Sequence, residues 1–324
     1  MLIDSYQRQF HYLRLSITDV CNFKCDYCLP DGYDCSNPRE FLTIDEIKRL
    51  VTAFAELGVS KVRITGGEPY LRKDLAEIIR VVKNVDGVDT VALTTNGYNL
   101  ETQIEKWVDA GLDSLNVSID SLKSDTFRLI TGSNKHQSIL KGIDKAISLG
   151  VKNVKVNAVL LKQFNENELT DFLQWIKFKP LSLRLIELME TGDNKTYFAK
   201  QHVNGEQLKN KIENDGWLPI VKSKVAGPAL EYCHPDFQGK IGFILPYSKD
   251  FCASCNRLRV SSVGNLHKCL FAEEGLNFRH LLQSSSQLSQ LKVWLQTQLD
   301  DKKETHFLQD NKTGATKHLA MLGG

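Results

Sequence analysis

In the first 190 residues, short β-branched segments alternate with amphipathic segments of helical period. This alternation restricts the possible folds more than any other feature of the sequence. Six strands are predicted, at 13–18, 61–65, 90–95, 114–119, 153–160 and 182–188. Helical patterns lie between them, at 43–57, 73–85, 100–110, 138–149 and 166–177. Because strands connected through helices pair in parallel, the pattern predicts an α/β fold. The length favours a partial (β/α)6 TIM-like barrel over a full barrel of eight units.

Polar or glycine-rich groups follow five of the predicted strands. They lie at 18–19, 66–69, 95–97, 118–120 and 187–190. One such loop would be ordinary turn chemistry, but parallel α/β folds place their active sites at this edge. Five loops at the same edge therefore predict a functional site.

The pattern changes near residue 190. Residues 192–240 are irregular and contain the turn signals Gly227-Pro228 and His234-Pro235. We therefore predict a barrel domain at 1–190, with a first cysteine group, and a C-terminal region at 191–324. The second region would be a cluster-binding extension that carries a second cysteine group and the final residues Gly323 and Gly324.

Charge and hydropathy exclude several partner classes. A formal net charge of +2 gives no basis for a nucleic-acid or membrane-surface partner. No run of about eighteen apolar residues predicts a membrane span. Residues 1–7 lack the basic and apolar parts of a secretory signal, so we expect a cytoplasmic protein. In a reducing compartment, clustered cysteines indicate metal binding or redox chemistry more often than disulfides.

The first cysteine group consists of Cys21, Cys25 and Cys28, on one short loop. Structural zinc usually takes four ligands, in pairs separated by a longer spacer. Three thiolates on one loop suit a cubane iron–sulfur cluster in which one iron lacks a protein ligand. Zinc binding, or an incidental cluster of cysteines, is the alternative.

The second group, Cys252, Cys255 and Cys269, also supplies three thiolates. A zinc site would need a fourth ligand, for which His267 or Cys233 are candidates. A second cubane would leave one iron open to a substrate.

Two arginines, Arg257 and Arg259, lie between these cysteines in the sequence. The planar guanidinium fork matches phosphate oxygens, so the pair suits an anionic ligand. A solvated strand edge with both arginines facing water is the alternative.

The segment Cys21-Asn22-Phe23-Lys24-Cys25-Asp26-Tyr27-Cys28 resembles the signature of the radical S-adenosylmethionine (SAM) superfamily. In that superfamily the aromatic residue before the last cysteine contacts the adenine, a role that fits Tyr27. The segment Gly66-Gly67-Glu68-Pro69 resembles the motif that binds the amino group of SAM. Two glycines there would let the backbone approach the ligand closely.

Over its whole length the chain resembles the GTP 3′,8-cyclase family. The ordered motifs are LRLSITDVCNFKCDYC, RITGGEP, LTTNG, NVSID, VKVNAV, RLIELM, FCASCNRLRVSS, CLF and the final Gly-Gly. The resemblance implies a lyase that converts GTP to (8S)-3′,8-cyclo-7,8-dihydroguanosine 5′-triphosphate, the first step of molybdenum cofactor biosynthesis. It implies two [4Fe-4S] clusters and SAM as cofactors. The deoxyadenosyl radical would take the ribose C3′ hydrogen, the C3′ radical would add to guanine C8, and a reduction would complete the ring.

Matching motifs also carry over site residues. The resemblance implies GTP contacts from Arg14, Arg63, Thr94, Lys155, Arg257, Leu258 and Arg259, and SAM contacts from Tyr27, Gly67, Ser118 and Met189. It implies catalytic roles for Arg14, Arg257, Arg259, Gly323 and Gly324. Each of these residues also has a purely structural interpretation. The basic strand residues could be charges at the rim of the barrel, and Met189 could be an ordinary core residue. Gly323 and Gly324 could be a frayed chain end. Leu258 is expected to contribute its backbone alone.

The remaining partners also come from the resemblance. They are a reductant for the clusters and the next enzyme of the pathway, which takes the product. A homodimer is also possible. Cys35 and Cys233 match no functional motif and are interpreted as structural or incidental. Two other functions remain possible from the residues: another two-cluster radical SAM enzyme acting on a peptide, and a zinc-binding module.

Overall fold

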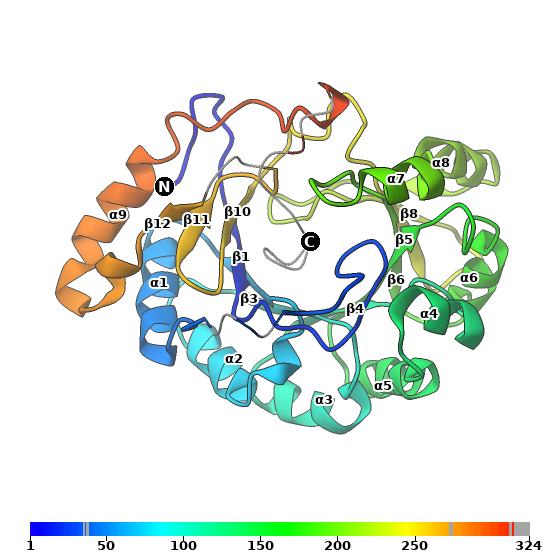
Figure 1. The fold of residues 1–324 in the computed structure, drawn as a ribbon, viewed down its shortest axis with the longest axis horizontal. Coiled ribbons are helices and arrows are strands. Elements are labelled where there is room, and N and C mark those ends of the chain that lie inside the picture. The colour runs from blue at the N-terminus through cyan, green and yellow to red at the C-terminus, as the bar shows by residue number, and fades with distance from the viewer. Residues whose placement is uncertain (35, 37–38, 272–274, 311–312, 314–324) are drawn as a thin grey trace.

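The structure is a computed structural model that describes residues 1–34, 36, 39–271, 275–310 and 313. In this part of the chain twelve strands form one sheet, in the order β12-β11-β10-β1-β2-β3-β4-β5-β6-β9-β8-β7 (Figure 1). The strands are β1 (Tyr12–Ser16), β2 (Lys61–Thr65), β3 (Thr90–Thr95), β4 (Ser114–Ser118), β5 (Asn153–Leu160), β6 (Ser182–Glu187), β7 (Leu218–Pro219), β8 (Leu230–Cys233), β9 (Lys240–Ile244), β10 (Arg257–Val260), β11 (Asn265–His267) and β12 (Leu276–Asn277).

Helices cover the outer face of the curved sheet, as Figure 1 shows for α1 to α6. The helices are α1 (Ile44–Glu56), α2 (Leu75–Lys83), α3 (Leu100–Asp109), α4 (Ser124–Thr131), α5 (His136–Ser148), α6 (Leu169–Ile176), α7 (Lys195–Gln201), α8 (Gly205–Asn214) and α9 (Leu288–Thr297). Short 3-10 turns lie at Pro69–Leu71, Arg279–Leu282, Ser285–Gln287 and Leu308–Asp310.

The predicted α/β barrel is confirmed, because β1 to β6 pair in parallel in sequence order. The C-terminal region contributes strands to the same sheet. Strand β10 pairs in parallel with β1, and β9 pairs in parallel with β6, so both edges of the barrel sheet are continued by later strands. Antiparallel strands β11–β12 and β8–β7 follow at the two ends.

Several elements were not among the sequence expectations, and α4, β9 and β10 are three of them. Strand β10 has four residues, two of them arginines, so it lacks the apolar run that indicates a strand. Strand β9 contains Gly242, and a glycine inside a strand weakens the strand pattern. Helix α4 spans only eight residues and stops at Gly132, whose φ of 69° ends the helix in the left-handed conformation.

Helix α1 shows how local sequence sets an element's boundaries. The Thr43 hydroxyl accepts from the Glu46 amide, and the Glu46 carboxylate accepts from the Thr43 amide, which forms a capping box. The buried face of the helix carries Ile47, Leu50 and Phe54, which are fully buried in the main core. The predicted helix start at Thr43 is therefore confirmed by its cap.

Alternation along the strands separates the core from the interior of the barrel. On β1, Leu13 and Leu15 are fully buried in the core between sheet and helices. Arg14 points to the other face and lines a cavity. Strand side chains alternate between faces, so the same pattern on neighbouring strands gives the barrel a polar interior.

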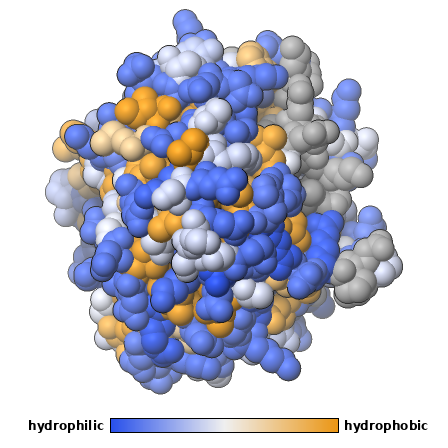
Figure 2. Space-filling model, turned by 90° about the vertical axis from the view of Figure 1, so that its left-hand side faces the viewer, coloured by the Kyte–Doolittle hydropathy of each residue, from blue (hydrophilic) through white to orange (hydrophobic). Residues whose placement is uncertain are grey.

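The outer surface carries no unusual apolar feature in the view of Figure 2, where hydrophilic residues predominate and apolar ones are scattered. Within the described ranges, no helix is long and apolar enough to cross a membrane.

Candidate functional site

Three arginines lie side by side across neighbouring strands. Arg14 of β1 is in register with Arg259 of β10 and with Arg63 of β2. Arg63 and Arg259 are only 4% and 7% exposed. In the described part of the chain, the buried Nε of Arg259 has no hydrogen-bond partner. Buried cations are costly unless an anion accompanies them, so this row fits an anionic ligand.

The same row perturbs the pKa values of its members. Burial and the charges of Arg259 and Arg63 lower the pKa of Arg14, and the charge of Tyr12 raises it by a smaller amount. Burial would raise the pKa of Tyr12, but the neighbouring Arg63, Arg14 and Lys61 outweigh it and lower that pKa to about 7. Tyr12 also accepts a hydrogen bond from Arg63 Nε. Sequence reasoning missed Tyr12, although its position two residues before Arg14 places both on one strand face.

A cavity connects this row with the second cysteine group. It is lined by side chains that include Tyr12, Arg14, Lys61, Arg63, Thr94, Asn116, Asn157, Arg184, Met189, Phe251, Cys252, Cys255, Arg257, Arg259, Cys269 and His306. Arg63 Nη1 donates to the Thr94 hydroxyl at 3.0 Å. The structure thus brings together most of the expected GTP contacts and the three C-terminal cysteines, from segments far apart in the chain.

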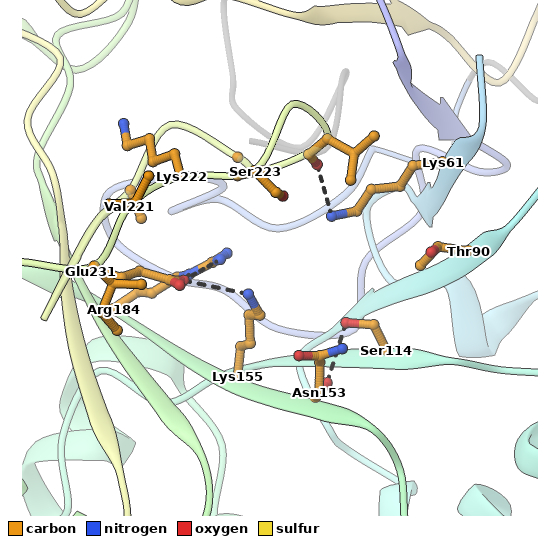
Figure 3. A pocket seen from close by; sticks show the side chains of 15 residues that line it. Lys61, Thr90, Ser114, Asn153, Lys155, Arg184, Val221, Lys222, Ser223 and Glu231 are labelled. Carbon is orange, nitrogen blue, oxygen red and sulfur yellow. Dashed lines mark hydrogen bonds and ion pairs between the residues drawn. The ribbon is translucent and has the colours of Figure 1, made fainter. Parts of the chain in front are cut away.

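A second, adjoining cavity holds the remaining expected cation, Lys155 (Figure 3). Lys61 and Arg184 line both cavities, so the basic surface is continuous between them. Burial, with the charges of Arg184, Lys61 and Arg63, lowers the pKa of Lys155 to about 8 against the opposing charge of Glu231. Lys61, Arg184 and Glu231 were absent from the sequence expectations.

Other expected contacts lie elsewhere. Leu258 is 1% exposed, packs in the main core and is outside the lining of both basic cavities. Gly67 and Ser118 lie at the carboxyl ends of β2 and β4, outside the lining of both basic cavities. Gly323, Gly324 and Cys35 lie outside the described residues.

The first cysteine group follows β1 on a loop in which the Cys28 amide donates to the Cys25 carbonyl at 2.9 Å. Burial raises the pKa of the Cys25 thiol, and the charges of Asp120, Cys28 and Cys21 add to this. The three sulfurs are therefore near enough to affect one another. Tyr27 donates its hydroxyl proton to Asp120 Oδ2 at 3.0 Å, which fixes the ring beside the cysteine loop.

The glycine pair after β2 contacts this cysteine loop. The Gly67 amide donates to the Thr18 carbonyl at 2.9 Å, and the Glu68 amide donates to the Val20 carbonyl at 2.7 Å. A Cβ on Gly66 would lie 2.4 Å from the Thr18 oxygen, and one on Gly67 would lie 2.3 Å from the Val20 oxygen. The absence of side chains is therefore required by the approach of two loops, and it positions the backbone that precedes Cys21.

In the second cysteine group, one thiol likewise senses the charges of the other two. Burial raises the pKa of Cys252, with contributions from Cys269 and Cys255. Burial would raise the pKa of Cys255, but the charges of Arg257 and Lys302 outweigh it and lower that pKa. Arg8 braces this loop from the N-terminal segment, since its Nη1 donates to the Cys252 carbonyl at 3.2 Å.

A small apolar cluster spans the two cysteine groups. Leu270, Phe271 and Leu308 form its buried part. Cys28 from the first group and Cys269 from the second both pack against it, with Tyr27 and Met189. The two groups therefore face a common interior.

The donor sets fit two iron–sulfur clusters. Each set offers three thiols, and in each set the charges of two of them raise the pKa of the third. Three thiol ligands would leave one iron of a cubane without a protein ligand. Among the described residues no three His, Cys, Asp or Glu side chains converge tightly enough for a single metal ion. A cubane makes a different demand, because its thiolates bind separate irons.

Comparison with known proteins gives two family matches. Residues 15–176 match the Radical SAM superfamily, and residues 181–308 match Molybdenum Cofactor Synthesis C. The chain is 54% identical over 324 residues to "GTP 3′,8-cyclase" of Tolumonas auensis, covering 100% of this chain and 96% of the relative. It is 54% identical to the protein of that name from Vibrio cholerae, covering 99% of this chain and 97% of the relative.

Solved structures share the fold at low sequence identity. Streptococcus suis SuiB bound to S-adenosylmethionine gives a TM-score of 0.58 at 16% identity, covering 94% of this chain and 71% of that one. SuiB bound to the precursor peptide SuiA gives a TM-score of 0.58 at 15% identity, and the match covers 96% of this chain and 71% of that one. These likenesses concern the fold alone. The identity with the cyclases extends over the whole chain, and with both family matches it shows that the chain belongs to the GTP 3′,8-cyclase family of radical SAM enzymes.

Proposed function

We propose that this chain converts GTP to (8S)-3′,8-cyclo-7,8-dihydroguanosine 5′-triphosphate, the first step of molybdenum cofactor biosynthesis. The observation that carries the proposal is the buried basic cavity, bordered by Cys252, Cys255 and Cys269, in a chain 54% identical to GTP 3′,8-cyclases. A polyphosphate supplies the negative charge that such a cavity lacks, and a nucleotide base can reach the cysteine side.

The direct test is anaerobic incubation of the reconstituted protein with GTP, SAM and dithionite, followed by chromatography and mass analysis of the nucleotide. The cyclised product should form, and iron analysis should give about eight irons per chain. A colourless zinc protein would support the zinc-binding alternative instead. SAM cleavage without any change in GTP would point to another substrate, such as a peptide.

The proposed roles follow the two halves of the site. Cys21, Cys25 and Cys28 would hold the first cluster, which with SAM would supply a 5′-deoxyadenosyl radical for removal of the ribose C3′ hydrogen. Tyr27, Gly67, Ser118 and Met189 orient SAM. Arg14, Arg63, Thr94 and Lys155 bind the nucleotide, Arg257 and Arg259 orient it beside the second cluster, and the Leu258 backbone assists. The protein's main contribution is placement, because the cofactor performs the difficult chemistry.

GTP affinity should fall as the pH rises above about 8, the pKa of Lys155 in the free protein. A bound phosphate favours the charged ammonium, so binding above this pH must be accompanied by proton uptake. Titrations of GTP between pH 7 and 9.5 measure the effect. Lys155→Arg keeps its charge and should remove the component centred near pH 8, while a separate component from Tyr12, with its pKa of about 7, remains. An identical pH profile in Lys155→Arg would contradict the assignment.

Deletion of Gly323 and Gly324 should abolish cyclisation but preserve both clusters and SAM cleavage. A tail without side chains can enter a narrow cavity, and its carbonyls and carboxylate can orient arginines such as Arg14, Arg257 or Arg259. The measurement compares product formation with deoxyadenosine release. Adding a peptide with the native C-terminal residues should restore part of the activity. Normal turnover by the truncated protein would assign the tail to a frayed terminus.

Several partners belong to the same proposal. They are a reductant for the clusters and the next enzyme of the pathway as recipient of the product, with a homodimer as the assembly to test by sedimentation. We also propose a cytoplasmic location. Seven of the described cysteines form no disulfide, which fits a reducing compartment.

A further inference from the structure

The cavity around Lys155 contains one acidic side chain, Glu231 of β8. The cavity lies where β2, β3, β4 and β5 begin, and its described lining includes the cations Lys61, Lys155, Arg184 and Lys222. Glu231 is the only carboxylate among these lining residues. Its position therefore sets the charge balance of the whole cavity.

One oxygen of Glu231 is shared by two cations (Figure 3). Arg184 donates to Oε1 from Nη2 at 2.8 Å and from Nε at 3.2 Å. Lys155 donates to the same oxygen from Nζ at 3.3 Å. The side chains of Arg184 and Lys155 are 8% and 15% exposed. These two cations are thus neutralised from within the protein, whereas the arginine row beyond them has no carboxylate in its described lining.

The charge state of Glu231 agrees with this geometry. Burial would raise the pKa of Glu231, but Arg184 and Lys155 outweigh it and lower that pKa. The carboxylate is therefore ionised at neutral pH. It attracts the same two cations that a phosphate entering the cavity would attract, and it repels the phosphate itself.

We propose that Glu231 is a specificity-determining residue that competes with the terminal phosphate of the nucleotide for Lys155 and Arg184. The inference rests on the proposed function, in which Lys155 contacts GTP. With the site empty of nucleotide, Glu231 holds both cations. As the triphosphate binds, they exchange this carboxylate for phosphate oxygens. The cyclised product retains the triphosphate, so the same carboxylate eases product release by taking the cations back.

The test compares wild type with Glu231→Gln, which removes the charge but keeps an oxygen that can accept from Arg184. Calorimetry on the reconstituted protein at pH 7 and low salt measures the Kd values of GTP, GDP, guanosine and inorganic tripolyphosphate. The variant should bind GTP and tripolyphosphate about tenfold or more tightly, GDP less so, and guanosine unchanged. Multiple turnover at saturating GTP should slow, because the product leaves more slowly.

Glu206→Gln is the matched control, because Glu206 is an exposed partner of Lys209 on α8. It should leave every Kd unchanged. If Glu231→Gln folds poorly, Glu231→Val supplies a second neutral side chain suited to a strand. Unchanged or weaker GTP binding in the folded neutral variants would overturn the inference and make Glu231 a structural brace between β8 and the barrel. A wild-type protein that does not bind GTP would instead overturn the proposed function.

Discussion

Replacing Cys269 with Ala should eliminate the cyclised nucleotide while SAM cleavage persists. Cys269 lies in the lining of the basic cavity with Cys252 and Cys255, and it does not belong to the loop that carries Cys21. Loss of this thiol should spoil the second cluster and misplace GTP. Misplacement of reacting groups by about 1 Å can cost about a hundredfold, so product formation should fall by at least that factor.

The readouts are product, deoxyadenosine and iron, measured in the same anaerobic reaction. Deoxyadenosine should still form, slowly and without cyclisation, and iron should fall to about half. Cys233→Ala is the matched control, because Cys233 lies on β8, outside the lining of the basic cavity and beyond the family motifs. Near-normal product from Cys269→Ala would show that Cys269 is not a ligand.

The barrel could be predicted because its information is local. Each of the strands β1 to β6 is a β-branched or apolar run, and each helix carries a buried face and end signals such as Thr43 and Gly58. The parallel pairing then follows from the connections alone. The boundary near 190 stays a prediction, since β9 and β10 belong to the same sheet as the barrel strands.

The site was predictable only in part. The cysteine motifs and the arginines of β10 are visible as short sequence patterns. The row that joins Arg259, Arg14 and Arg63 is not, because it depends on the register of strands distant in sequence. Tyr12 and Glu231 have no motif, and their importance appears only when the neighbouring cations are placed around them.

Burying the arginine row costs folding free energy, so the arginines are expected to lower stability while they serve ligand binding. Burial, and then the charge of Arg257, lower the pKa of Arg259, so the fold opposes its charge. Such a residue destabilises the protein without ligand and is retained for what it binds. The row should therefore respond to mutation in opposite directions for stability and for activity.

Arg259→Ala should consequently reduce GTP cyclisation by about a hundredfold or more and leave the melting temperature of the free protein equal or higher. The activity loss reflects a missing preorganised cation, a change that commonly costs a factor of about one hundred to one thousand. The equal or higher stability reflects relief of repulsion among buried cations. Arg259→Lys should recover little activity, because an ammonium supplies a point charge without the planar fork. Arg80→Ala, an exposed change on α2, is the control for both measurements. If Arg259→Ala lost iron and stability together with activity, the arginine would be a structural element of the cluster loop, and the basic row would not be the binding surface for GTP.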